Sequence, residues 1–170
     1  MRQTPTEAAL TPLEARPSFL LSQLGRYAAE RFAHQLRPLG LQPRHFGLLL
    51  QLSRAEGQSQ QQLADGLGVH RNVMVGLIDE LEARGLVERR RHPGDRRANA
   101  LYLSPTAQRL VQQAERVASA HDRQLVAALS ADEQRLLISL LQRVAAHAGL
   151  HAGVHPGLQT THDGEPPAAG

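Results

Sequence analysis

Residues 59–85 carry two short helical patterns that are separated by a single glycine, Gly68. Ser59 and Gln62 have the spacing of a capping box, in which each side chain bonds the backbone N–H of the other residue. The second pattern repeats its apolar residues at helical spacing and stops at Gly85, a residue type that commonly ends helices. Two short helices joined by a glycine turn are typical of a helix-turn-helix. This segment therefore predicts the central motif of the fold.

The next segment, residues 87–103, reads VERRRHPGDRRANALYL and predicts a β-hairpin. Pro93 and Gly94 form a turn signal, because glycine adopts the positive φ angles that tight turns need. The second strand alternates, with Leu101 and Leu103 on one face. A hairpin directly after a helix-turn-helix is a wing.

The positive charge of the chain is concentrated on this hairpin. The sequence has no lysine, so its 19 basic residues are all arginine, and its formal net charge is +3. Residues 87–102 hold five arginines and two acids, and 5 − 2 = +3 accounts for the whole excess. A charge run is often only a solvated face. A cationic focus on an otherwise neutral chain favours a polyanionic partner.

The remaining helical patterns cover about residues 18–38, 43–54, 105–129 and 130–144. Aromatic residues make up only 3% of the chain, which suits packed helices better than a β-sandwich. The sequence thus predicts a mainly α fold, a winged helix-turn-helix at about 43–104. The chain has no cysteine, which excludes disulfides, thiolate nucleophiles and cysteine-ligated zinc. Residues 1–17 are expected to form a flexible arm, and the Gly- and Pro-rich residues 149–170 a disordered tail.

The words HRNVMVGLIDELEARGLVERRRHPGDRRANALYLSPTAQ closely resemble the MarR family of bacterial transcription regulators, and the resemblance covers about residues 18–148. DRR matches the D-x-R motif in the wing of family members, and LYLSPTAQ matches the strand and the helix start that follow this motif. The resemblance implies a homodimer, with dimerisation helices at about 18–38 and 105–148. It also implies repression through a pseudo-palindromic double-stranded DNA operator, and release of that DNA by a small phenolic or anionic effector.

Candidate DNA-binding residues follow from the wing and from the start of the second short helix. Arg97 matches the family arginine that enters the minor groove, where the negative potential attracts arginine. Arg71 and Asn72 lie where base edges are read, and they pair well with guanine and adenine. Arg89 or Arg91 is expected to pair internally instead. The full set of DNA candidates is Arg97, Arg96, Arg71, Asn72, His70, Val75, Ser59, Gln60 and Arg90.

The helices that line the effector cleft of family members contain Arg26, Tyr27, His34 and His45, which are the candidate ligand residues. His147, His151 and His155 have the i, i+4, i+8 spacing of a helical metal site, but nearby glycines and a proline interrupt that helix. We therefore expect no metal site and no cofactor.

Two other classes of function compete with this prediction. An enzyme is disfavoured, because no Ser-His-Asp motif, phosphate loop or metal cluster is present in the sequence. A winged helix that has lost DNA and binds protein is favoured only by the apolar Val73, Val75 and Gly76 in the second short helix. No apolar run is long enough for a transmembrane helix and the N-terminus has no signal-peptide core, so a cytoplasmic location is expected.

Overall fold

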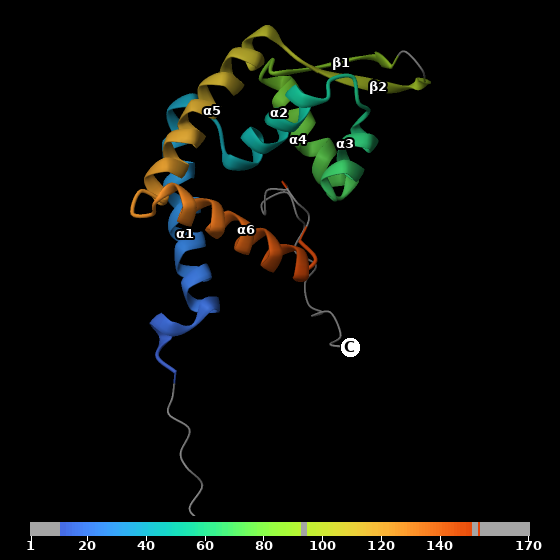
Figure 1. Ribbon diagram of the computed structural model, residues 1–170. Coiled ribbons are helices and arrows are strands. Elements are labelled where there is room, and N and C mark those ends of the chain that lie inside the picture. Colours follow the sequence, from blue (N-terminus) through green and yellow to red (C-terminus); the bar gives the residue numbers. More distant parts are fainter. Residues whose placement is uncertain (1–10, 93–94, 151–152, 154–170) are drawn as a thin grey trace, which may run out of the picture.

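The computed structural model describes residues 11–92, 95–150 and 153, without the side chains of residues 92 and 95–98. Its helices and strands follow the predicted order: the chain is mainly helical and contains one two-stranded sheet, the predicted hairpin, among the residues described (Figure 1). The elements are η1 Leu13–Ala15, α1 Pro17–Leu36, η2 Arg37–Leu39, α2 Pro43–Arg54, α3 Gln60–Leu67, α4 Arg71–Ala83, β1 Val87–His92, β2 Asp95–Leu103, α5 Pro105–Leu125 and α6 Ala131–His147. The predicted fold class is confirmed.

The hydrophobic core lies where α2, α3, α4 and the hairpin meet the first half of α5. Helix α2 contributes a continuous buried stripe, because its apolar residues recur every three or four positions. The core is aliphatic, as the low aromatic content predicts. Its fully buried large side chains include Leu48, Leu49, Leu52, Leu63, Met74, Ile78, Leu81 and Leu101.

The helix-turn-helix is fixed by local backbone chemistry. The Ser59 hydroxyl accepts from the Gln62 backbone N–H at 3.2 Å, and the Gln62 side chain accepts from the Ser59 backbone N–H at 2.8 Å. Gly68 ends α3 in the left-handed region at φ 60°, where glycine has no Cβ to clash. The predicted capping box and glycine turn are both confirmed.

The wing is an antiparallel hairpin whose base is anchored to the core. Leu101 and Leu103 are both buried and lie opposite Arg89 and Val87 on β1. The backbone of β2 also pairs with the connection before α3: the Leu101 N–H donates to the Gln58 carbonyl, and the Gly57 N–H donates to the Leu101 carbonyl, each at 2.9 Å. The hairpin then extends outward beyond α3 and α4 (Figure 1).

The elements α2, α3, α4 and the β1–β2 hairpin together form a unit called here the reading head. The long helices α1 and α5 pack together at one side of it (Figure 1). Phe32 of α1 stacks against Phe46 of α2 and His121 of α5, with ring centroids 5.8 and 5.3 Å apart. Helix α6 has no buried residue.

Some predicted boundaries shift. Helix α5 ends at Leu125, so the prediction that it continues to Leu129 was wrong: turns at residues 126–129 lead into the capping box of Ser130 and Glu133. Residues 13–15 form a 3-10 turn within the expected arm. Most of the predicted arm and nearly all of the predicted tail lie outside the described residues.

Candidate DNA interface

The N-terminus of α4 offers an exposed set of polar side chains. His70 is the N-cap, and its Nδ1 accepts from the Asn72 backbone N–H at 3.3 Å. Arg71 and Asn72 are exposed in the first turn. One turn further, Val75 is half-buried. The first turn of α4 thus presents an arginine and an asparagine to solvent, beside backbone N–H groups that favour anions.

Two apolar positions of α4 behave differently from each other. Val73 packs against the core, as its apolar type predicts. Gly76 is exposed, and a Cβ added there would meet nothing within 4 Å. A flat surface at Gly76 lets another backbone or a base approach the helix closely.

The start of α3 lies beside this surface. Ser59 uses its hydroxyl oxygen as the acceptor in the capping box, so its O–H is available to donate. Among the described residues, the buried Gln60 Nε2 has no hydrogen-bond partner. The Ser59 hydroxyl thus retains a donor that a phosphate oxygen can accept, whereas the Gln60 amide would have to turn outward to do so.

On the wing, Arg90 is held by its own hairpin. Its guanidinium donates to Glu88 Oε2 from Nε at 3.2 Å and from Nη2 at 2.8 Å, and it lies 4.6 Å from the centre of the Tyr102 ring. The hydrogen bond to Glu88 raises the pKa of Arg90 above its usual value. Arg96 and Arg97 belong to β2, but their side chains lie outside the described residues.

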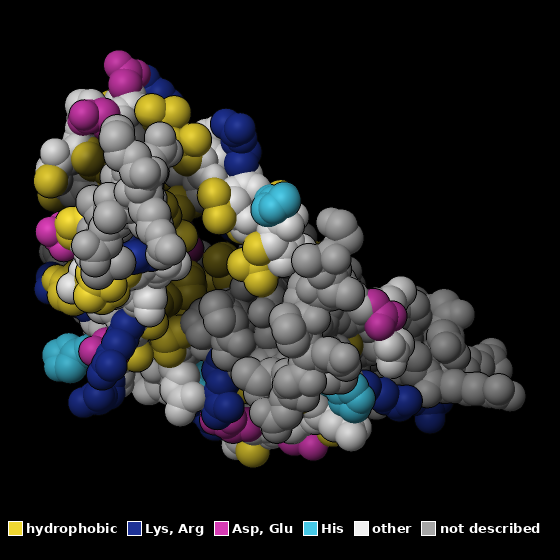
Figure 2. All heavy atoms as spheres, turned by 90° about the horizontal axis from the view of Figure 1, so that it is seen from below, with side chains coloured by type: hydrophobic (Ala, Val, Ile, Leu, Met, Phe, Trp, Pro, Cys, Tyr) yellow, Lys and Arg dark blue, Asp and Glu magenta, His cyan; other side chains and the backbone are white. Residues whose placement is uncertain are grey.

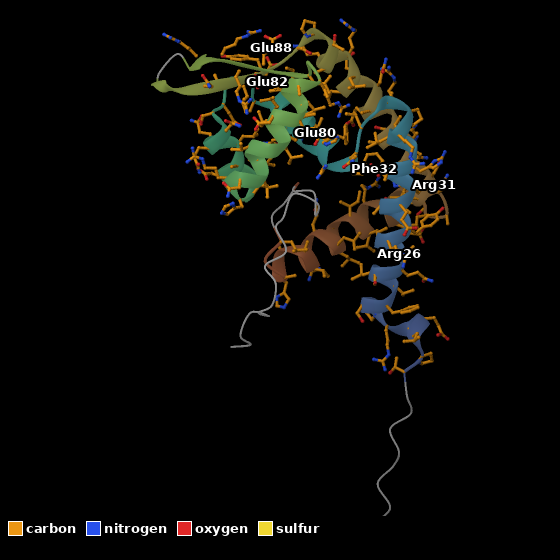
Figure 3. The ribbon with its side chains drawn as sticks, turned by 180° about the vertical axis from the view of Figure 1, so that it is seen from behind. Arg26, Arg31, Phe32, Glu80, Glu82 and Glu88 are labelled. Carbon is orange, nitrogen blue, oxygen red and sulfur yellow. The ribbon has the colours of Figure 1, made fainter. Side chains whose placement is uncertain are left out.

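The neighbouring Arg89 points the other way and pairs with α4, the second helix of the helix-turn-helix, which is the recognition helix of such motifs. Its guanidinium bonds the carboxylates of Asp79 and Glu82 of α4, and its side chain is only 18% exposed. Figure 3 labels Glu82 and Glu80 on α4 beneath the hairpin. The expectation that either Arg89 or Arg91 pairs internally is confirmed for Arg89, whereas Arg91 is exposed.

The four candidate ligand residues occupy different environments. Arg26 is exposed and pairs with Glu30 at 2.7 Å, which raises the pKa of its guanidinium. The exposed Tyr27 accepts from Arg31 at 3.3 Å, and His34 is exposed. His45 is 1% exposed and lies inside the reading head.

Among the cavities that open to solvent in the described part of the chain are two that none of those four residues lines. One of about 310 Å³ lies between the end of α2, the end of β2 and the start of α5. The other, of about 380 Å³, lies at the junction of α1 and α2 and is lined by Ala33, Arg37, Gly40, Leu41, Gln42 and Pro43.

Neither a metal site nor a membrane span is found in the described ranges. No three His, Cys, Asp or Glu residues gather there in a way that would hold a metal ion. None of the helices described is both long and apolar enough to cross a bilayer. His151 and His155 lie outside the described residues, and His147 is exposed at the end of α6.

Sequence reasoning missed how the acids of α4 are used. Asp79, Glu80 and Glu82 stand on a helix expected to approach a polyanion, where unpaired carboxylates would repel phosphate. The structure pairs all three with basic groups from α2 and β1. The acids on this helix are therefore a signal, present in the sequence, that basic partners must lie elsewhere in the fold, although they do not identify those partners.

Comparisons with known proteins agree with this geometry. A model of the MarR family matches residues 39–98. The transcriptional repressor CouR, bound to a 23-mer DNA duplex, is 31% identical with a TM-score of 0.72, over 82% of this chain and 99% of that one. CouR from Rhodococcus jostii RHA1 bound to p-coumaroyl-CoA is 30% identical with a TM-score of 0.69, over 80% and 96%.

A MarR family protein of Mycobacterium tuberculosis, in complex with salicylic acid, is 29% identical with a TM-score of 0.60, over 76% of this chain and 96% of that one. The likeness to CouR covers 82% of this chain and nearly the whole length of that chain, so it extends beyond the winged helix-turn-helix. With its fold, its wing and these relatives in agreement, the chain belongs to the MarR family of transcriptional regulators.

Proposed function

We propose that this protein is a ligand-responsive repressor that binds a pseudo-palindromic DNA operator as a homodimer in the cytoplasm. The observation that carries the proposal is that the chain presents an exposed first turn of α4 together with an arginine-rich hairpin. A relative of 31% identity is a repressor bound to a DNA duplex. The family is one of transcription regulators rather than enzymes.

Each DNA candidate takes a role that suits its chemistry. In this proposal Arg71 grips guanine, Asn72 grips adenine and Val75 meets a thymine methyl group in the major groove. Arg97 enters the minor groove beside it. Phosphate contacts come from the remaining candidates, which are His70, Ser59, Gln60, Arg96 and Arg90.

Exposed apolar side chains on α1 and α6 support the dimer. A single chain leaves large hydrophobic residues on both helices in contact with water, and such patches mark interaction sites. Hydrophobic side chains are visible on the lower face of the molecule (Figure 2). The exposed residues include Phe19, Leu20, Leu21, Leu24, Leu136, Ile138, Leu140, Leu141 and Val144.

The effector class follows from the relatives. One relative was solved with p-coumaroyl-CoA and another with salicylic acid, so aromatic acids and their CoA thioesters are the ligands to test first. Of the four candidate ligand residues, Arg26, Tyr27 and His34 are exposed and remain the ones proposed to contact the effector, whereas the buried His45 is not. A ligand that changes the spacing of the two α4 helices would weaken both half-sites, because half-sites lie about 34 Å apart.

The test begins by selecting a preferred duplex from a random DNA pool with the wild-type protein. Binding to that duplex and to a scrambled one is then titrated between about 50 and 200 mM salt, where phosphate contacts give a steep loss of affinity. We expect an inverted repeat, preferred over the scrambled duplex. Recovery of no preferred sequence, with binding insensitive to salt, would favour a protein-binding winged helix instead.

A further inference from the structure

The N-terminus of α2 holds a buried histidine that touches two other segments of the chain. His45 is 1% exposed, and its Nδ1 lies 3.3 Å from the Gln42 backbone nitrogen and 3.5 Å from Arg84 Nη1. Both of these neighbours are hydrogen-bond donors, so Nδ1 is an acceptor and the ring proton sits on Nε2. This contact completes the capping box that starts α2.

The other ring nitrogen faces the recognition helix. His45 Nε2 lies 3.1 Å from Glu80 Oε1, although the oxygen stands off the line of the N–H bond, so the contact is electrostatic more than a linear hydrogen bond. The second oxygen of Glu80 lies 3.6 Å from Arg44 Nη2. Figure 3 labels Glu80 on α4. One carboxylate of the recognition helix therefore meets two basic side chains of α2.

The same cluster reaches the turn between α1 and α2. Arg84, at the C-cap of α4, donates from Nη2 to the Gly40 carbonyl at 2.7 Å. Gly40 follows the 3-10 turn η2 and has φ 66°. The C-terminal half of α4 is thus attached both to the start of α2 and to the segment that connects α2 with the long helix α1.

Burial favours the uncharged form of His45. Removal from water lowers the pKa of His45 below its ordinary value of 6.5; Glu80 opposes this change, and the charges of Arg44 and Arg84 reinforce it. These are the charged groups that act on the ring from α2 and α4. The neutral form is the one whose Nδ1 can accept from its two donors.

We propose that His45 is a positioning residue for DNA reading, which as a neutral imidazole holds α4 against the start of α2 and, with Arg84, against the Gly40 turn. This inference rests on the DNA-binding function proposed above. In this proposal His45 itself makes no contact with DNA. It sets the angle at which Arg71 and Asn72, at the other end of α4, are presented.

Protonation works against this arrangement. A proton on Nδ1 turns it into a donor that faces the Gln42 N–H and the Arg84 guanidinium, so both contacts become repulsive. Because the folded-state pKa lies below the unfolded value of about 6.5, the arrangement is fully formed above that pH and is lost as the pH falls further, through the lower folded-state pKa. DNA affinity is expected to fall in the same direction.

The experiment compares His45→Ala with His45→Gln on the duplex selected by the wild-type protein. Glutamine is an ordinary capping-box residue at this position, with an oxygen for the Gln42 N–H and an amide N–H for Glu80. We expect His45→Ala to lose roughly fivefold or more in affinity, as expected when buried polar partners are left unpaired. His45→Gln should retain affinity near wild type.

The pH dependence of DNA affinity distinguishes this role from a purely structural one, which would leave that dependence unchanged. From about pH 7.5 to about pH 5.5, wild-type affinity should fall more steeply than that of His45→Gln, which has no proton to gain in this range. The control is His147→Gln, an exposed histidine at the end of α6, which should keep the wild-type profile. Circular dichroism and sedimentation establish that each variant is folded and assembled.

Two outcomes overturn the inference. One is a folded His45→Ala protein with wild-type affinity. The other is a His45→Gln protein with the wild-type pH profile, or one as defective as the alanine variant. Should His45→Ala fail to fold, His45→Gln alone decides between these results. A wild-type protein that selects no DNA would instead refute the proposed function and would leave nothing for His45 to position.

Discussion

Arg89 of strand β1 and Asp79 of helix α4 form an ion pair that joins the wing to the recognition helix, and Glu82 accepts from the same guanidinium. Because Arg89 is largely shielded from solvent, its charge is used for ion pairing inside the reading head and is not free to contact DNA. The arginines of the hairpin are thus divided between internal pairing and the exposed surface.

The first prediction concerns the ion pairs of Arg89. Arg89→Ala should lower the free energy of unfolding by about 1 kcal/mol, the usual size for a partly exposed ionic contact. It should also weaken DNA binding, because two carboxylates are left unpaired near phosphate. Arg91→Ala, which removes the same charge from an exposed position, should leave the free energy of unfolding unchanged.

Urea denaturation and duplex titration measure these effects. Neutralising the freed acids with Asp79→Asn and Glu82→Gln in the Arg89→Ala background should restore much of the DNA affinity. Failure of that restoration would show that the acids do not act through repulsion of the DNA.

The wing tip gives the second prediction. Arg97→Ala should cost about 1–3 kcal/mol of binding free energy if the side chain fills a minor groove. Arg71→Ala should relax discrimination at one base pair in each half-site. The matched control is Arg135→Ala. Arg135 lies on α6 and pairs with Asp132, so its loss should leave DNA binding unchanged. A well-folded Arg97→Ala dimer with full affinity would reduce the charged hairpin to a solvated surface.

Two glycines of one short helix give opposite stability predictions. Gly68→Ala forces an L side chain into the left-handed region at φ 60°, which should cost about 1 kcal/mol of unfolding free energy or more. Gly66→Ala lies within α3 and meets nothing within 4 Å, so it should gain about 0.5–1 kcal/mol. Thermal or urea unfolding compares the two, and equal effects would contradict the assignment of Gly68 as the required turn residue.

Assembly gives the fourth prediction. Sedimentation at micromolar concentration should give twice the chain mass of 18.6 kDa. Leu140→Asp on the apolar face of α6 should shift the protein toward the monomer, because it buries a charge in the proposed interface. Gln142→Asp on the polar side of the same helix should not. A wild-type monomer at that concentration would rule out the two-half-site mechanism.

The effector gives the fifth prediction. Among phenolic carboxylates and aromatic acyl-CoA thioesters, at least one compound should raise the melting temperature, because a ligand that binds the native state stabilises it. The same compound should weaken binding to the selected duplex. If none does both, the proposed ligand response is incorrect for this protein.

Features set by neighbouring residues were predictable from the sequence. The capping boxes at Ser59 and Ser130 and the glycine turn at Gly68 each depend on a few adjacent side chains. The buried face of β2 followed from strand alternation at Leu101 and Leu103. These rules act within one turn or one strand and need no knowledge of the tertiary fold.

Features that depend on distant partners were less accessible. The resemblance suggested a ligand role for His45, but in the chain it is enclosed by Glu80 and Arg84, 35 and 39 residues further along the sequence. Internal pairing of Arg89 was expected, yet its partners on α4 were not identifiable. Such contacts appear only when helices and hairpin are packed together.

The connection before α3 joins the wing largely through main-chain atoms, by the bonds of Gln58 and Gly57 to Leu101, and one side chain of the connection, Glu56, accepts from the Leu103 N–H at 3.0 Å. Main-chain bonds survive most substitutions, since every residue except proline supplies the same N–H and C=O groups. The exposed positions at the start of α4, such as Arg71, Asn72 and Gly76, are therefore free to diverge without displacing the hairpin. This scaffold permits related sequences to acquire new operator preferences one residue at a time, while the distance between the two DNA-reading elements is inherited unchanged.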